Sequence, residues 1–187
     1  MTPRTIFVAA LVWAVLVVVA VHFLDFPGSV PDFQHASGGG TLLDATPAFS
    51  ATGVYDRLGG FGEDGRRNYS FRNVTIDVLL PLSVLPFLFL LMRKAVTPFR
   101  FGQLLRAALL SLPVIYVVFD LLENSIVLVL LGNYPQRLDM LAGSLPYATI
   151  VKRAASLLAI AVPLTMLGLN SVRGRAAMRA SLSGRAR

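Results

Sequence analysis

The sequence predicts an all-α protein, a four-helix transmembrane bundle with an outer loop that carries a short interfacial helix. Two observations lead to this prediction. Of the 187 residues, 55% are hydrophobic and 14% are charged, whereas soluble domains carry about 25% charged residues. The hydrophobic residues are also gathered into four long blocks, as expected when the bilayer is the solvent.

Each block is long enough to cross a bilayer, because about twenty helical residues at about 1.5 Å each cover a hydrocarbon core of about 30 Å. The first block is expected to stay as an anchor, since no A-x-A-like cleavage site follows it; a cleaved signal peptide is the alternative. The spans form one domain, residues 1–172, followed by a basic cytoplasmic tail, residues 173–187. The predicted spans are residues 5–24, 75–92, 106–131 and 147–170.

The outer loop, residues 26–74, has two parts of different composition. Residues 26–53 are rich in Gly, Pro, Ser and Thr. They offer little apolar periodicity, so we expect a poorly ordered loop in which residues 28–50 are dispensable for folding. In residues 54–74 aromatic side chains alternate with charges. This pattern predicts a short interfacial helix, a glycine turn and a helix leading into the membrane.

The basic residues predict the orientation of the bundle. One alternating half of the topology, made of the N-terminus, the link after the second span and the tail, holds ten Lys or Arg and no acidic residue. The other half holds five Arg accompanied by six acidic residues. Because cytoplasmic flanks carry the excess of Lys and Arg, we expect both termini in the cytoplasm and the outer loop on the opposite side. A bacterial inner (plasma) membrane is the expected location.

The composition also excludes several kinds of function. The chain has no cysteine, which excludes disulfides, zinc-thiolate sites and thiol catalysis. The net charge of +7 comes from residues that flank the apolar blocks, where they meet lipid headgroups, so we expect no nucleic-acid partner. The lone intramembrane histidine, His22, has no accompanying metal-binding motif, so no metal and no cofactor are expected.

Ionisable residues inside the spans mark the candidate site, because such groups are costly in a membrane and usually functional. Asp120, Glu123 and Asn124 fall on one stripe of the third span. At a similar depth lie Asp77 in the second span and Lys152 and Arg153 in the fourth. We therefore expect Asp120 and Glu123 to face the bundle interior and to meet Asp77 or the two cations. Two alternatives remain open: pairs that only hold helices together, and cations that extend to the interface.

Part of the sequence resembles a group of small uncharacterised four-helix bacterial integral membrane proteins. The first matching stretch is YDRLGGFGEDGRRNYSFRNVTIDVLLPL, residues 55–82, and the second is DLLEN, residues 120–124. The resemblance covers most of residues 55–170 and singles out Arg66 and Tyr69 in addition to Asp77, Asp120, Glu123 and Asn124. It implies the four-helix fold and brings no activity with it.

The expected function is an integral membrane protein, more a binding protein than an enzyme, with an outward-facing intramembrane polar pocket. The pocket would bind a lipid, a small ligand or a partner's transmembrane segment; the expected partners are membrane lipids, another membrane protein or a second copy of the chain. One alternative is a small transporter or proton-coupled subunit that uses Asp120 and Glu123. The other is an intramembrane enzyme acting on lipid headgroups, with a carboxylate as acid or base and Arg66 or Arg67 holding phosphate. Catalytic residues are unknown.

Overall fold

The computed structural model describes the backbone of residues 2–185 and the side chains of residues 2–172. Within residues 2–185 the chain forms α-helices and connecting segments, with no strand. Four helices are long and apolar enough to cross a membrane. These helices are α1 (Pro3–Phe23), α5 (Ile76–Val96), α6 (Gln103–Asn133) and α7 (Asp139–Arg185). α5 is the apolar part of a longer helical run, Gly62–Val96. The all-α prediction and the four apolar helices are therefore confirmed.

The helix boundaries differ from the predicted spans mainly at both ends of the fourth, because α7 runs from Asp139 to Arg185 whereas the predicted span covered residues 147–170. Residues 139–146, expected in a loop, form the first turns of α7, and Pro146 lies inside that helix. Pro146 is the eighth residue of α7, where it removes one backbone donor but does not end the helix, so it did not mark the boundary that the sequence suggested. The side chains of the predicted basic tail, residues 173–187, lie outside the described residues.

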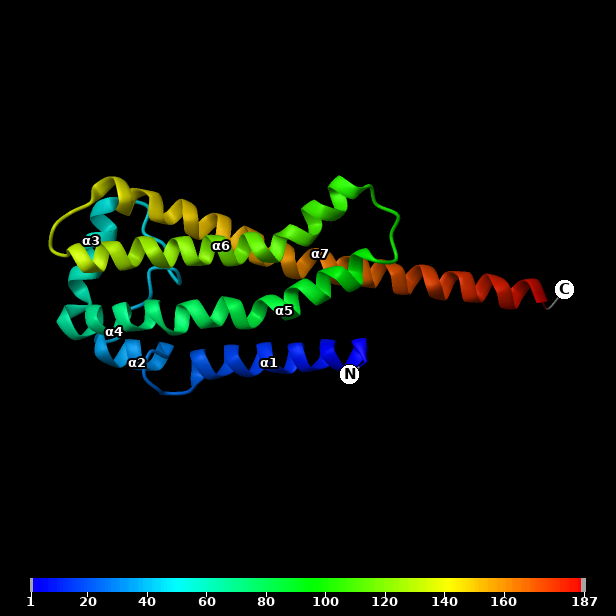
Figure 1. Cartoon of the computed structure of the whole chain (residues 1–187), viewed down its shortest axis with the longest axis horizontal. Helices are drawn as coiled ribbons and strands as arrows, with labels where there is room; N and C mark the ends of the chain where they lie inside the picture. The colour runs from blue at the N-terminus through cyan, green and yellow to red at the C-terminus, as the bar shows by residue number, and fades with distance from the viewer. Residues whose placement is uncertain (1, 186–187) are drawn as a thin grey trace.

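The long helices lie side by side, and α1 is at the edge of the group. α6 packs against α5 and α7, while α1 packs mainly against α5. Figure 1 shows the first residues of α1, the end of α5 and the start of α6 at the same end of the molecule. α5 carries Pro81 and Pro86 inside the helix and curves rather than running straight, as expected for a helix interrupted by proline.

Three shorter helices cover the opposite end of the group. α2 (Val30–Ala36), α3 (Ala51–Gly60) and α4 (Gly62–Val74) follow one another, and α4 leads into α5 after a break at Thr75. Serine residues cap the N-termini of α2 and α3. The Ser29 hydroxyl accepts a hydrogen bond from the Asp32 amide at 3.2 Å, and the Ser50 hydroxyl accepts one from the Gly53 amide at 3.0 Å. Such N-caps supply partners for otherwise unpaired amides. The turn between α3 and α4 uses Gly62, whose φ of 66° favours glycine.

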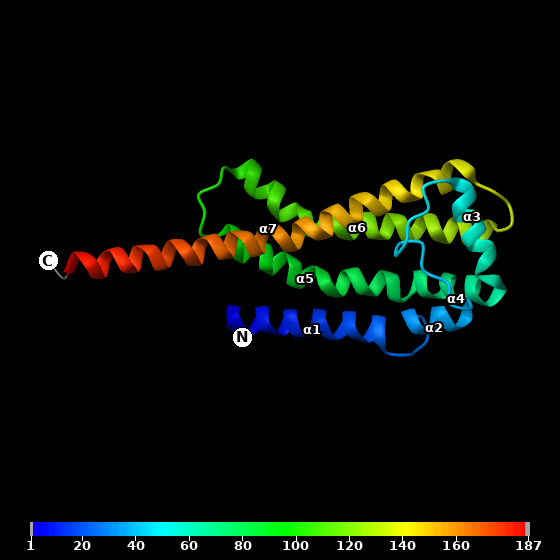
Figure 2. The ribbon, with the colours of Figure 1, turned by 180° about the vertical axis from the view of Figure 1, so that it is seen from behind.

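The expectation of a poorly ordered loop over residues 26–53 is wrong. This segment contains α2, and it buries Phe33, Leu42 and Leu43 against α3, α4, α6 and α7. Figure 2 shows the chain between α2 and α3, in cyan, running back from the end of the molecule toward α5 and α6. A few well-placed apolar side chains and long-range polar contacts order the segment, and neither leaves a periodic pattern in the sequence.

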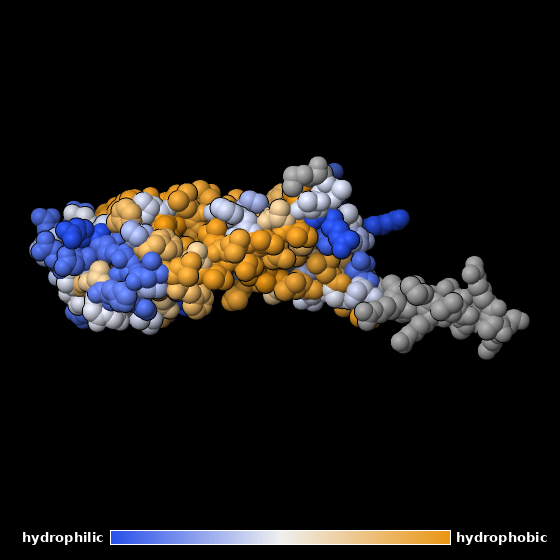
Figure 3. Space-filling model, turned by 90° about the horizontal axis from the view of Figure 1, so that it is seen from below, coloured by the Kyte–Doolittle hydropathy of each residue, from blue (hydrophilic) through white to orange (hydrophobic). Residues whose placement is uncertain are grey.

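Two apolar clusters form the interior, one near each end. The larger includes Phe33, Leu58 and Leu130, and the smaller includes Met92 and Met166. On α6, the residues before Pro113 contact the smaller cluster and those after Ser125 contact the larger one. The acidic residues of α6 lie between them. Figure 3 shows an apolar band across the middle of one face, with hydrophilic residues at both ends.

Candidate functional site

Lys152 on α7 lies at the centre of a buried ionic cluster. Its Nζ is 3.1 Å from an Asp120 carboxylate oxygen and also contacts the carboxylate of Glu123. Glu123 is 1% exposed and Lys152 is 8% exposed. The hydroxyl of Thr149, one turn earlier on α7, donates to Glu123 as well. Buried charges require this kind of pairing, because an isolated ion in a medium of low dielectric constant is very costly.

A second ion pair joins the end of α4 to the first turn of α5. An Arg72 guanidinium nitrogen is 2.8 Å from an Asp77 carboxylate oxygen, and Arg72 is only 3% exposed. The same guanidinium donates to the Gly28 carbonyl at 2.7 Å, which ties the chain before α2 to α4. The break at Thr75 brings the two charged side chains into contact around the junction between the helices.

Asn124 connects the two ion pairs. Its side-chain amide donates to the Asp77 backbone carbonyl at 2.8 Å and to an Asp120 carboxylate oxygen at 3.2 Å. Both interactions start from α6, one reaching α5 and the other remaining on α6. The polar side chains of α6 and α7 and the backbone carbonyl of Asp77 on α5 therefore form one connected network.

The segment between α2 and α3 closes this network from the outside. Lys152 Nζ is 3.4 Å from an Asp44 carboxylate oxygen, and the Arg153 guanidinium donates to the Asp44 and Ala45 carbonyls. The Leu43 amide donates to the Tyr69 hydroxyl at 3.2 Å. Arg57 donates to the carbonyl of Leu42 at 2.8 Å, and partial burial lowers the pKa of Arg57. These contacts explain why a glycine-rich segment has one defined path.

A pocket of about 250 Å³ adjoins the network. It lies between the end of α1, α2, the following segment, the α4–α5 junction and α6. Its ionisable lining consists of three carboxylates, one guanidinium and one imidazole, from Asp44, Asp77, Asp120, Arg72 and His22. Arg72 is paired with Asp77, and Asp44 and Asp120 share the ammonium of Lys152, so carboxylates outnumber cations in the lining. Among the described residues, no group of three or more His, Asp or Glu is arranged to hold a metal ion.

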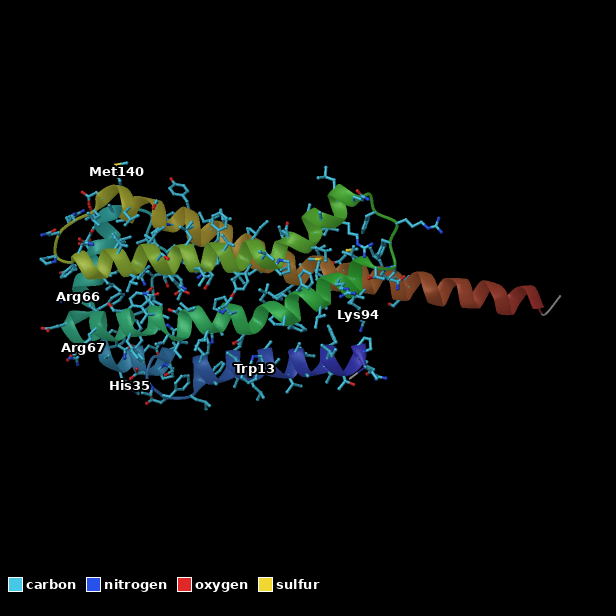
Figure 4. All side chains as sticks on the ribbon, in the orientation of Figure 1. Trp13, His35, Arg66, Arg67, Lys94 and Met140 are labelled. Carbon is cyan, nitrogen blue, oxygen red and sulfur yellow. The ribbon has the colours of Figure 1, made fainter. Side chains whose placement is uncertain are left out.

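The predicted site residues fall into two sets. Asp77, Asp120, Glu123, Asn124 and Lys152 are brought together in the network, whereas Arg153 binds its edge through backbone carbonyls. Arg66 lies elsewhere: its guanidinium stacks 4.2 Å from the centroid of the Tyr134 ring and donates to the Leu58 carbonyl. Figure 4 shows Arg66 and Arg67 at the end of the molecule near α3 and α4. Tyr69 holds the segment after α2 and does not line the pocket.

Sequence reasoning missed three members of the network. Asp44 lies in the segment expected to be poorly ordered, although the preceding Leu42-Leu43 pair is an apolar signal for burial. Arg72 was counted only as a basic residue of the outer flank. Thr149 carries no charge, and its position three residues before Lys152 is the only signal that it shares a helix face with that lysine.

No family model, curated protein or solved structure matches the chain.

Proposed function

We propose that the protein is an integral membrane protein whose outward-facing polar pocket binds a small ligand or lipid headgroup that carries a positive charge. The four apolar helices support the membrane location. The basic residues at the end opposite the pocket favour an orientation with that end, and both termini, in the cytoplasm. The pocket would then open at the outer side of a bacterial inner membrane.

The acidic lining of the pocket carries the proposal. Three carboxylates face the pocket, and the one cation among its lining residues, Arg72, is already paired with Asp77. In the wider network, Asp44, Asp120 and Glu123 share the single ammonium of Lys152. An ammonium group of a ligand would balance the remaining negative charge and would gain from the low dielectric constant of the surroundings.

The α4–α5 junction beside the pocket also favours a binding role over a purely structural one. Asn73, one turn before Asp77, is 3% exposed, and neither polar atom of its amide has a hydrogen-bond partner among the described residues. Each unsatisfied buried polar group costs about 1–3 kcal/mol. A network selected only for helix packing would replace such a residue with an apolar one, whereas sites of function commonly retain such costs.

A proton is the alternative occupant, because one of the carboxylates of the network could carry it. The sequence disfavours a route for protons across the whole membrane. No Asp or Glu occurs in residues 1–24, 78–119 or 140–187, so the halves of the helices away from the pocket carry no carboxylate relay. The lipid-modifying alternative has less support, because Arg66 is held at Tyr134 and Arg67 pairs with Asp64.

Native mass spectrometry tests the proposal. The protein is purified in mild detergent and titrated with dioleoyl phosphatidylethanolamine or with free ethanolamine, which separates a lipid ligand from a soluble amine. Asp44→Asn should weaken binding about tenfold, which corresponds to about 1.4 kcal/mol. Asp64→Asn, which removes an exposed acid outside the pocket, is the matched control. Equal binding by the wild type and both variants would count against an amine site in this pocket.

A further inference from the structure

A second concave site lies at the opposite end of the molecule, between the first turns of α1 and the last turn of α5. It is a groove of about 660 Å³. Its lining combines three basic side chains, Arg4, Arg93 and Lys94, with the apolar side chains of Ile6, Phe7 and Leu90. Figure 4 shows Lys94 at this end of α5, facing the start of α1.

The basic side chains of this groove have no acidic counterparts. Among the described residues, none of the three forms an ion pair with a carboxylate. The acid nearest to Arg4 in the sequence is Asp25. The acids nearest to Arg93 and Lys94 are Asp77 and Asp120. Both of the latter belong to the network near the opposite end. The groove therefore carries an uncompensated positive charge.

The apolar side of the groove is continuous with the membrane-facing surface. Ile6 is 45% exposed, and the ring of Phe7 lies 4.7 Å from the Lys94 ammonium, which rests over its face. Phe7 also contacts Phe87 of α5, with ring centroids 5.9 Å apart. A ligand in this groove thus meets cations at its mouth and hydrocarbon along its wall. A free inorganic anion would use only the first of these features.

We propose that this groove binds an anionic phospholipid of the cytoplasmic leaflet. The phosphate and headgroup would contact Arg93, Lys94 and Arg4, and the first carbons of one acyl chain would lie along Ile6 and Leu90. Basic pockets between transmembrane helices on the cytoplasmic side are suited to anionic headgroups for this electrostatic reason. The site is separate from the polar pocket, and its occupant has the opposite charge.

Lipid titration in native mass spectrometry tests this proposal. The purified full chain is titrated with dioleoyl phosphatidylglycerol and, separately, with dioleoyl phosphatidylcholine, which has the same acyl chains and no net charge. The wild type should prefer the anionic lipid. In the double variant Arg93→Gln/Lys94→Gln this binding should weaken about 30-fold, because each basic residue near a lipid headgroup contributes about a fivefold factor.

A second double variant provides the matched control. Arg100→Gln/Arg106→Gln removes the same charge from the same end of the molecule, but neither residue lines the groove. All four side chains are exposed, so both variants should fold and retain the wild-type thermal midpoint. The control should bind phosphatidylglycerol within about twofold of the wild type, since only the diffuse attraction changes.

Three results would overturn the proposal. Equal losses in both double variants would show diffuse attraction to the basic end without a site. Equal binding of the two lipids would remove the role of the cations. Competition by inorganic phosphate as effective, mole for mole, as competition by phosphatidylglycerol would show that the apolar wall contributes nothing.

Discussion

Lys152 of α7 and Glu123 of α6 form an ion pair that is almost completely buried between the two helices. Asp120 and Asp44 flank the same ammonium, one from α6 and one from the segment after α2. A single cation therefore fixes two helices and the segment that covers them. Lys152 therefore contributes to holding the pocket region together, beside the contacts made by Arg57, Tyr69 and Arg153.

Replacing this cation should strongly destabilise the protein. Lys152→Met keeps much of the side-chain volume but leaves Glu123 and Asp120 without their cation, which should cost about 3–5 kcal/mol. The measurement is unfolding in detergent without added lipid. Lys94→Met is the matched control, because Lys94 is the only other lysine and is exposed; it should change stability by about 0.5 kcal/mol or less.

A compensating variant separates loss of charge balance from loss of packing. Adding Glu123→Gln to Lys152→Met removes one of the unpaired carboxylates, so the double variant should regain part of the lost stability. Strictly additive losses in the two single variants would show that the ion pair is not coupled as the structure indicates.

Phe33 should be a principal anchor of the segment before α3. Its ring is fully buried, 5.1 Å from the centroids of both Phe61 and Tyr69. Phe33→Ala should cost about 3–5 kcal/mol, the usual loss when a buried aromatic ring is removed. Phe49→Ala, in the same connecting region but 73% exposed, should have little effect on the thermal midpoint. A small effect of Phe33→Ala would support the original expectation of a dispensable loop.

The long helices were predictable because their cause is local in the sequence. Each apolar block carries its own signal, and residues 5–24 and 106–131 agree with α1 and α6 within a few residues. The side of α6 that is buried was predictable for the same reason, since Asp120, Glu123 and Asn124 recur at helical spacing. Length and periodicity sufficed for these elements.

The path of residues 37–50 was not predictable in this way. It depends on carbonyl groups that accept from Arg57 and Arg153, and every residue has a carbonyl. Partners more than a hundred residues apart, such as Asp44 and Lys152, leave no periodic signal in one sequence. The pocket could not be predicted either, because this segment supplies one of its walls.

The hydroxyl of Tyr69 should control the order of that segment. Tyr69→Phe removes the acceptor of the buried Leu43 amide, at a cost of about 1–3 kcal/mol for the unsatisfied donor. Hydrogen exchange measured by mass spectrometry should become faster across residues 40–46 and stay unchanged in α6. Tyr147→Phe, in a ring that is 70% exposed, is the control and should leave exchange unaltered. Unchanged exchange in Tyr69→Phe would mean that this hydrogen bond does not hold the segment.

The orientation of the helices can be tested with single cysteines, because the chain has none of its own. Met140 is 94% exposed in the first turn of α7, and Leu104 is 86% exposed in the first turn of α6. The two residues lie at opposite ends of the bundle. The excess of Lys and Arg beside Leu104 predicts that this end faces the cytoplasm. In intact cells a membrane-impermeant maleimide should therefore label Met140→Cys and leave Leu104→Cys unlabelled. After permeabilisation both variants should react, which shows that each thiol is accessible.

Labelling of Leu104→Cys in intact cells, with Met140→Cys protected, would reverse the orientation. The polar pocket would then face the cytoplasm, and the basic groove would face the outer leaflet.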